Sequence, residues 1–224
     1  METPIFREID TYEISHPTLI QKTVKRCFDI FASAFGLVIL LPVFIIIALA
    51  IYIDSKSPVI FKQTRVGKDG KEFIIYKFRS MKVISAENND VSNNYLTLEI
   101  DPRVTKVGKF IRKYRLDELP QLVNVLIGDM SIVGPRPEVP YYVHYYTERQ
   151  KKTLSVRPGL TGTATILFLN EDKILSQSLD PEKTYIEDIM PAKIEQNLLY
   201  LKNFSLYNDF SIIFLTIKKL IFRF

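Results

Sequence analysis

The sequence is poor in the residues that build covalent and metal-bound frameworks. Its 224 residues include no tryptophan, one cysteine, Cys27, and two histidines, His16 and His144. A single cysteine excludes an intramolecular disulfide and is compatible with a reducing compartment. Two distant histidines and one cysteine argue against a structural zinc site, which uses four such ligands. Neither framework is therefore expected to hold this fold.

Charge is absent from one long stretch, Ile30 to Ile53. As one continuous helix this stretch would be about 36 Å long, longer than the roughly 30 Å hydrocarbon core of a bilayer. Pro42 lies at its midpoint, where a proline removes a helical hydrogen bond at a cost of about 3 kcal/mol unless the helix kinks. Each half alone would reach the middle of a bilayer and return. The pattern favours a re-entrant helix-break-helix hairpin with its break at Pro42.

Basic residues flank this apolar stretch on both sides. They are Lys22, Lys25 and Arg26 before it, and Lys56, Lys62, Arg65 and Lys68 after it. The positive-inside rule then keeps both ends in the cytoplasm, so we expect a monotopic protein of the inner (cytoplasmic) membrane. A straight span and a buried core helix are the alternatives.

The net charge of +5 favours anionic partners, which are nucleic acid, anionic lipid or phosphorylated substrates. No nucleic-acid-binding motif is present, so nucleic acid is not an expected partner. We divide the chain into a leader over residues 1–21, a re-entrant membrane segment over 22–54 and a cytoplasmic catalytic domain over 55–224. Self-association into a homo-oligomer is left open by the sequence.

The expected fold is α/β and mostly helical, with interfacial amphipathic helices. Val59–Phe61 and Phe73–Tyr76 are short β-prone runs around a glycine-containing loop, which is typical of a β-hairpin. Hydrophobic periodicity predicts the helices. The other expected segments are a polar loop over Ile84–Thr97, helices over Lys106–Tyr114, Leu119–Ile127, Leu167–Leu175 and Tyr185–Phe204, and a basic amphipathic tail over Phe210–Phe224. That tail suits either a membrane interface or a surface helix packed on the core.

The block from Asp101 to Pro137 concentrates the chemistry of the chain. Asp117 and Glu118 are adjacent carboxylates within it. The cations around them are Arg103, Lys106, Lys109, Arg112, Lys113, Arg115 and Arg136. A carboxylate attacks phosphorus only where cations neutralise the phosphoryl oxygens. The block therefore predicts a phosphate-handling site.

The position of Asp117 before a helix adds to this prediction. The helix over Leu119–Ile127 would have Pro120 in its first turn and end at Gly128. Asp117 would be its N-cap, where the positive end of the helix favours an ionised carboxylate and a bound phosphate. Mg²⁺ binds through one or two carboxylates plus substrate phosphates, so Asp117 and Glu118 are its candidate ligands. A purely structural cap and a solvated basic face are the simpler interpretations.

At this point the chain resembles a known family, the bacterial sugar transferases. These are monotopic phosphoglycosyl transferases that start glycan assembly on a polyprenyl phosphate. The likeness is continuous from about Lys22 to Gly162 and weaker beyond. The matching blocks are KRCFD (25–29), SPVIFKQTRVGKDGKEFIIYKFRSM (57–81), DPRVTKVGKFIR (101–112), LDELPQLVNVLIGDMSIVGPRPE (116–138) and VRPGLTG (156–162).

The resemblance implies a two-step reaction. Asp117 would attack the β-phosphate of a UDP-sugar, releasing UMP, and polyprenyl (undecaprenyl) phosphate would then take the phosphosugar from the aspartate. Glu118 would complete the acidic pair and assist with Mg²⁺ or with the acceptor. The resemblance places Arg112 and Arg136 near the phosphates, and Arg79, Arg103 and Arg157 are weaker candidates for the same role.

Two positions depart from the family pattern. Leu41 precedes Pro42, where the family often has a serine whose hydroxyl can satisfy a carbonyl freed by the kink. Thr163–Leu167 replaces the usual residues after the Thr-Gly pair at the end of the last matching block, in a region expected to touch the nucleotide sugar. The identity of the sugar therefore does not carry over.

Two other classes of function compete with the enzyme. A non-enzymatic, basic, membrane-anchored scaffold that binds anionic lipid or partner proteins would keep its function when Asp117 is replaced by asparagine. A nucleic-acid binder would show steep salt dependence without any need for Mg²⁺ or a lipid acceptor.

Overall fold

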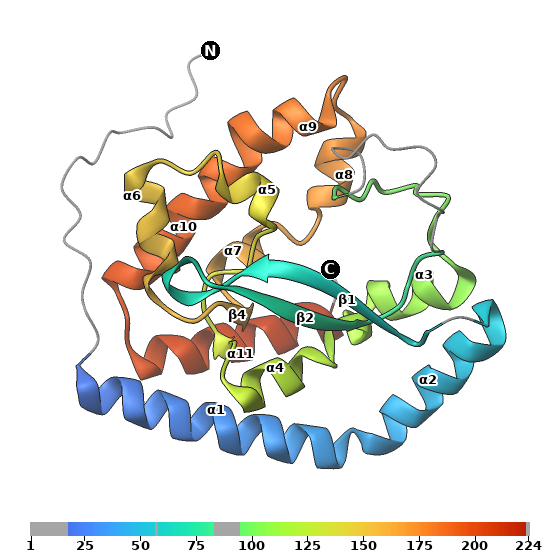
Figure 1. Ribbon diagram of the computed structural model, residues 1–224, viewed down its shortest axis with the longest axis horizontal. Coiled ribbons are helices and arrows are strands. Elements are labelled where there is room, and N and C mark those ends of the chain that lie inside the picture. Colours follow the sequence, from blue (N-terminus) through green and yellow to red (C-terminus); the bar gives the residue numbers. More distant parts are fainter. Residues whose placement is uncertain (1–17, 57, 83–94, 223–224) are drawn as a thin grey trace.

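The computed structural model describes residues 18–56, 58–82 and 95–222 (Figure 1). Within these ranges the chain is mostly helical and carries two small two-stranded sheets. The expectation of a mostly helical fold with a β-hairpin is confirmed. The leader expected over 1–21 and the polar loop expected over 84–97 lie largely outside the described residues.

Two helices meet at a sharp bend near the start of the described chain. Helix α1 spans Leu19–Ile39, α2 spans Leu41–Ser55, and the two are bent by 61°. Pro42 lies in the first turn of α2, where its missing N–H costs no helical hydrogen bond. The break therefore falls at Leu40 rather than at Pro42. No single described helix is long and apolar enough to cross a bilayer, whereas the bent pair together meets that requirement by length and composition.

Some apolar side chains of the bent pair pack against the rest of the protein, whereas most of the others are exposed. Ile47 and Ile51 of α2 are buried against Phe78 and Ile111, so part of the uncharged stretch packs on the rest of the protein. Most of the remaining large apolar side chains are exposed. The most exposed of them within the uncharged stretch are Phe31, Phe35, Val38, Ile39, Leu41, Ile45, Ile46, Leu49, Tyr52 and Ile53. An uninterrupted apolar face of this kind marks an interaction surface.

The β-hairpin is confirmed and is longer than expected. Strand β1 spans Ile60–Val66, β2 spans Glu72–Phe78, and they pair antiparallel along their whole length. The short 3₁₀ turn η1, Lys68–Gly70, connects them. Because side chains alternate along a strand, Lys77 points to the same face of β2 as Ile75, which is buried.

Two short helices follow the hairpin in the described chain. Helix α3 spans Lys106–Lys113, and Thr105 caps its start by accepting the backbone N–H of Gly108. Helix α4 spans Gln121–Ile127 and ends at Gly128, whose φ of 101° lies in the left-handed region that glycine tolerates. Both helices and the stop at Gly128 agree with the sequence pattern.

The expected N-cap of α4 was wrong. Asp117 lies inside a 3₁₀ turn, η3, which spans Leu116–Glu118, and the residue that precedes α4 is Pro120, with no side-chain cap. Pro120 already has helical backbone angles. The chain therefore enters α4 through continuous helical turns, without the extended residue that a capping side chain requires.

A second sheet, which the sequence pattern did not indicate, joins two glycine-containing motifs. Strands β3, Ser131–Val133, and β4, Gly159–Thr161, pair in parallel. The backbone of β4 and the residue after β3 approach so closely that a Cβ on Gly159 would lie 2.1 Å from the nitrogen of Gly134. The motifs GPRP and RPGLTG therefore need glycine because they pack against each other, backbone to backbone.

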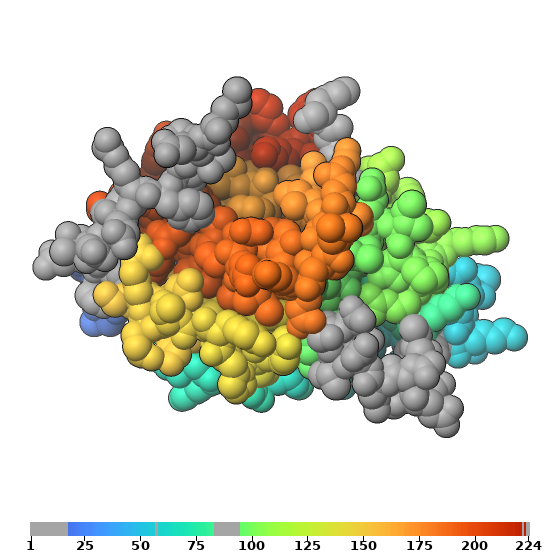
Figure 2. Space-filling model, turned by 90° about the horizontal axis from the view of Figure 1, so that it is seen from above, coloured from blue at the N-terminus to red at the C-terminus, as the bar shows by residue number. Residues whose placement is uncertain are grey.

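The C-terminal part is a set of mostly short helices. They are α5 Pro140–Val143, α6 Glu148–Lys151, η4 Lys152–Ser155, α7 Thr163–Leu167, α8 Glu171–Ser176, α9 Pro181–Thr184, the π-helix η5 Tyr185–Ile189, α10 Met190–Lys202 and α11 Leu206–Ile221. The helix expected over 167–175 is confirmed only from Glu171 onward, because the chain leaves helical geometry after α7 and α8 begins there. The helix over 185–204 and the helical tail are confirmed. Seen from above, the α8–α10 segment lies between the α5–α6 region and the α3 region (Figure 2).

Helix α1 is fixed to this body by the KRCFD motif. Lys25 forms an ion pair of 2.6 Å with Asp209 of α11. Arg26 donates to two backbone carbonyls at the C-terminal end of α4, and buried Asp29 accepts the backbone N–H of Ile132 at 3.0 Å. The motif therefore sets the position of the bent pair along one side of the molecule, opposite α8 and α9 (Figure 1).

Candidate active site

A cavity of about 710 Å³ lies between the hairpin, α3, η3 and the C-terminal helices. Its wall contains the acidic pair, Asp117 and Glu118. The cations lining it are Arg65, Lys77, Lys109, Arg112, Lys113, Arg115, Arg136 and Lys193. The other acids lining it are Glu99, Asp101, Glu138, Glu171 and Asp172. Which of these charges are already paired decides where an anion can bind.

Neither carboxylate oxygen of Asp117 has a hydrogen-bond partner among the described residues. The residue is only 7% exposed, and its Oδ1 atom is buried and makes no hydrogen bond with the described residues. Burial and the neighbouring Glu118 carboxylate raise the pKa of Asp117, while Lys77, Arg112 and Arg115 oppose that rise. This direction is opposite to the one that an N-cap would give. An unsatisfied, desolvated carboxylate facing a cavity is suited to react with a bound group or to bind one.

Glu118 is fully engaged by cations. Arg136 donates to both of its carboxylate oxygens, at 3.1 and 2.5 Å, Arg115 donates to Oε1 at 3.2 Å, and Lys77 lies 3.8 Å from the same atom. Burial would raise the pKa of Glu118, but these three cations outweigh it and hold the pKa well below its ordinary value. Glu118 is therefore an ionised anchor for three cations.

A strained turn positions the acidic pair. Arg115 has a φ of 56°, in the left-handed region that costs a residue with a side chain roughly 1–2 kcal/mol. This conformation reverses the chain between α3 and η3, and it lets Arg115 reach forward to Glu118. Below the turn, Asn124 of α4 donates to the Ile74 carbonyl at 2.7 Å and accepts the Tyr76 N–H at 3.1 Å, which fixes α4 to β2.

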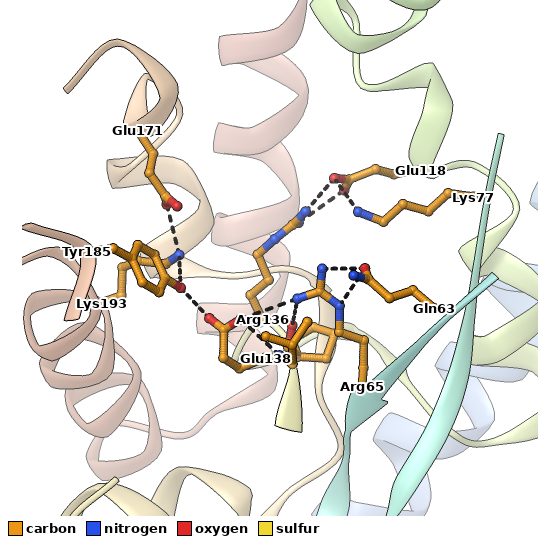
Figure 3. Close-up of polar contacts among 11 residues, drawn as sticks. Gln63, Arg65, Lys77, Glu118, Arg136, Glu138, Glu171, Tyr185 and Lys193 are labelled. Carbon is orange, nitrogen blue, oxygen red and sulfur yellow. Dashed lines mark hydrogen bonds and ion pairs between the residues drawn. The ribbon is translucent and has the colours of Figure 1, made fainter. Parts of the chain in front are cut away.

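Arg136 is presented by a segment that β1 holds in place. The Val66 N–H donates to the Glu138 carbonyl at 2.8 Å. Arg65 donates to the Pro137 carbonyl at 3.2 Å and to the Glu138 carboxylate at 3.3 Å (Figure 3). With both neighbours fixed, the Arg136 guanidinium extends toward Glu118 and Lys77 (Figure 3).

Cations on α3 provide the uncommitted positive charge. Arg112 lines the cavity, and its guanidinium makes no hydrogen bond or ion pair with any residue that the structure describes. It lies close enough to Asp117 to lower the pKa of that group. Lys109 and Lys113, on the same helix, also line the cavity. An entering phosphate would therefore find unpaired charge on the α3 side of Asp117.

Three arginines indicated by the sequence lie away from the cavity wall. Arg79 is 4% exposed and donates to the Ser55 hydroxyl at the end of α2. Arg103 is held by Asp101, with an ion pair of 2.7 Å. Arg157 is on the surface and donates to the Gly128 carbonyl at 2.7 Å, closing the end of α4. The structure thus brings Asp117, Glu118, Arg112 and Arg136 together and leaves the other three in structural contacts.

Several residues of the cavity were not expected from the sequence. Lys77 is the clearest case, because burial lowers its pKa to about 8 while Glu118 opposes that fall. The sequence signal was its place in the hairpin, on the same face as buried Ile75. Tyr185 and Lys193 carry no comparable signal, since they reach the cavity from helices far along the chain.

The described residues offer few side-chain ligands for a metal ion at this site. No group of three or more His, Cys, Asp or Glu side chains that could hold a metal is present among residues 18–56, 58–82 and 95–222. Of the acidic pair, Asp117 has a free oxygen, whereas both Glu118 oxygens are bound by cations. This set fits a Mg²⁺ ion held by Asp117 and substrate phosphates, which is a common mode for that ion. It does not favour Glu118 as a ligand.

A buried, unpartnered carboxylate beside a cation-lined cavity is an arrangement that fits a phosphorylated substrate. The chain belongs to the bacterial sugar transferase family, whose family model matches residues 20–223. The resemblance seen in the sequence is thereby confirmed, and with it the classification of the chain as a transferase.

Three relatives illustrate the match. The chain is 38% identical to a UDP-N-acetylgalactosamine-undecaprenyl-phosphate N-acetylgalactosaminephosphotransferase of Aeromonas hydrophila, covering 92% of this chain and 45% of the relative. It is 40% identical to a UDP-glucose:undecaprenyl-phosphate glucose-1-phosphate transferase of Escherichia coli K12, covering 89% and 40%. It is also 40% identical to the exopolysaccharide production protein PSS of Rhizobium leguminosarum, covering 87% and 93%. The chain thus spans less than half of the first two relatives.

Proposed function

We propose that this chain transfers a sugar 1-phosphate from a UDP-sugar to undecaprenyl phosphate and so initiates a cell-surface glycan or glycoconjugate. The observation that carries the proposal is the unpartnered, mostly buried carboxylate of Asp117, a residue that lines a cavity together with unpaired cations. The relatives named as undecaprenyl-phosphate sugar phosphotransferases support the same reaction.

The reaction has two displacements at one phosphorus. In the first, the ionised Asp117 carboxylate attacks the β-phosphorus of the UDP-sugar, a P–O bond forms, and the bond to the leaving UMP breaks. In the second, an oxygen of undecaprenyl phosphate attacks the same phosphorus, and the aspartate carboxylate leaves. The product is undecaprenyl-diphosphate sugar, and Asp117 returns to its starting state.

The cations make this anion-to-anion approach feasible. Arg112 and its α3 neighbours have charge available for phosphoryl oxygens. Arg136 and Lys77 are held in position by Glu118, so their donors are preorganised rather than recruited during the reaction. Glu118 acts as a positioning residue in this scheme. A Mg²⁺ ion bound to Asp117 and the donor phosphates would add charge neutralisation.

The bent pair α1–α2 explains how such a site meets a lipid. We propose that its exposed apolar face inserts into the cytoplasmic leaflet of the inner membrane as a re-entrant hairpin, with the catalytic part in the cytoplasm. Exposed apolar residues of α3, α4 and α11 extend this surface; among them are Phe110, Ile127, Phe210 and Phe214. The charged head of undecaprenyl phosphate could then reach the α3 side of the cavity from the membrane.

The proposal is tested by an assay of UMP release. The purified protein in detergent or nanodiscs is incubated with Mg²⁺, undecaprenyl phosphate and each member of a panel of UDP-sugars. We expect release of UMP, rather than UDP, with at least one donor, together with a lipid-linked product. If no donor releases UMP but the protein still binds anionic vesicles, the scaffold interpretation holds instead.

We expect the activity to fall at alkaline pH because Lys77 loses its positive charge there. Its pKa of about 8 lies below the ordinary 10.5, so its positive charge is present below pH 8 and is lost as the pH rises through that value. We expect kcat/KM, which reports the free enzyme, to fall above about pH 8. In the Lys77→Arg variant the charge persists, so the fall should move to higher pH. An unchanged profile in that variant would assign the limit to another group.

A further inference from the structure

The part of the cavity wall formed by α8, η5 and α10 carries a second group of charged and polar side chains. Lys193 of α10 forms an ion pair of 2.8 Å with Glu171 of α8 and lies 3.3 Å from the Tyr185 hydroxyl. Tyr185 in turn donates to the Glu138 carboxylate (Figure 3). The Lys193 and Glu171 side chains are 13% and 26% exposed and line the cavity. This wall therefore offers an ammonium and a carboxylate to a bound molecule, with the buried Tyr185 hydroxyl holding Lys193 from behind.

Two further hydroxyls in the cavity wall have no partner. Tyr142 of α5 is 1% exposed, and Thr165 lies on α7. The Tyr142 Oη and Thr165 Oγ1 atoms are buried and make no hydrogen bond with the described residues. A buried polar group left unsatisfied costs about 1–3 kcal/mol. Both residues line the cavity, so these unpaired hydroxyls are candidates for contact with a ligand.

This wall lies within reach of the acidic pair. Arg136, which binds Glu118, is separated by only one residue from Glu138, which binds Tyr185. Figure 3 shows two groups of contacts, Arg136 with Glu118 in one and Glu138, Tyr185, Lys193 and Glu171 in the other, which the chain from Arg136 to Glu138 joins. A molecule whose phosphate rests at Asp117 can therefore extend along this row.

We propose that Thr165 and Tyr142, with the Lys193–Glu171 pair, form the subsite for the sugar ring of the nucleotide donor and select among sugars. The proposal rests on the proposed function and deepens it. A hydroxyl-bearing ring matches a wall that offers hydroxyls, a carboxylate and an ammonium. A polyprenyl chain does not match it, because it is apolar and would arrive from the side of α1 and α2, opposite α8 and α9 (Figure 1).

Thr165 and Tyr142 can each be tested by a substitution that removes only the hydroxyl. Thr165→Val keeps the shape of the side chain and removes only the unpartnered hydroxyl, and Tyr142→Phe does the same on α5. Neither change breaks a described hydrogen bond, so we expect the melting temperature to stay or rise. The matched control is Thr163→Val on the same helix. Its hydroxyl donates to the Gln196 carbonyl at 3.2 Å, away from the cavity wall.

The measurement is kcat/KM for each UDP-sugar, together with inhibition by UMP, in the wild type and the three variants. We expect Thr165→Val and Tyr142→Phe to change the ratio of kcat/KM between the best donor and the others by about tenfold, the equivalent of one hydrogen bond. The ratio should hold in Thr163→Val, and inhibition by UMP should hold in all variants, because UMP lacks the sugar.

Three outcomes would contradict either the sugar subsite or the proposed function, and each points to one of the two. Unchanged ratios in both cavity variants would overturn the sugar subsite. Weaker inhibition by UMP in those variants would assign the wall to the nucleoside and would also overturn it. A wild type that releases UMP from no donor would instead overturn the proposed function, so the two failures are distinguishable.

Discussion

Replacing Asp117 by asparagine is expected to abolish UMP release, with a loss of at least about a thousand-fold in kcat/KM, because an amide is a poor nucleophile toward phosphorus. The change is nearly isosteric, and Oδ1 makes no hydrogen bond with the described residues. The fold should therefore persist. The measurement is UMP release in the presence of undecaprenyl phosphate, alongside the melting temperature.

The matched control for this substitution is Asp69→Asn. Asp69 lies in the hairpin turn, where its side chain is 61% exposed and faces only Lys68, at 3.7 Å. Its positive φ of 58° is one that asparagine also tolerates. We expect its activity to match that of the wild type. Wild-type rates in Asp117→Asn would refute the role of Asp117 as nucleophile.

Replacing Arg136 is expected to have the second-largest effect. Arg136→Ala removes both hydrogen bonds to buried Glu118 and a preorganised donor near the phosphates. Loss of one such donor costs on the order of 10²–10³-fold in rate. Leaving Glu118 with fewer cations should also lower the free energy of unfolding. Arg136→Lys keeps the charge but loses the two-pronged contact, so it separates charge from geometry.

Arg157→Ala is the control for Arg136. The sequence ranks both as phosphate-site candidates, but Arg157 contacts only the Gly128 carbonyl among described residues. We expect kcat/KM within about threefold of the wild type and a small loss of stability at the end of α4. Equal losses in the two variants would mean that position relative to the cavity does not decide the role of an arginine here.

The elements that the sequence predicted correctly are determined by residues close to one another in the chain. The hairpin follows from β-prone runs around a glycine loop, and α4 ends at Gly128 because glycine tolerates a positive φ. The acidic pair of Asp117 and Glu118 stood out because the cations that surround it are close in the sequence. Each of these signals acts over a few residues.

The features that were missed depend on distant contacts. The parallel pairing of β3 and β4 involves only three residues on each strand, too few for a periodic signal. The N-cap expectation for Asp117 failed because Pro120 continues the helical backbone of the preceding turn. Residue type alone could not separate the cavity arginines from the others, because the role of each depends on the group that it contacts. Arg103 contacts Asp101, Arg79 the Ser55 hydroxyl and Arg157 the Gly128 carbonyl.

Helix α3 connects the two features that stood out in the sequence, the uncharged stretch and the block around the acidic pair. The uncharged stretch was expected to form a re-entrant membrane hairpin, and within it Ile47 and Ile51 are buried against the β-hairpin and α3. The same α3 carries Arg112 at the cavity wall. A shift of α2 would therefore move α3 and with it Arg112 at the cavity wall.

The most direct test of the covalent mechanism is the intact mass of the protein after incubation with its UDP-sugar and Mg²⁺ in the absence of undecaprenyl phosphate. We expect the wild type to gain one phosphosugar, to lose it when undecaprenyl phosphate is added, and Asp117→Asn to gain none. UMP release without any mass gain, or the same mass gain in Asp117→Asn, would contradict an aspartyl-phosphosugar intermediate at Asp117.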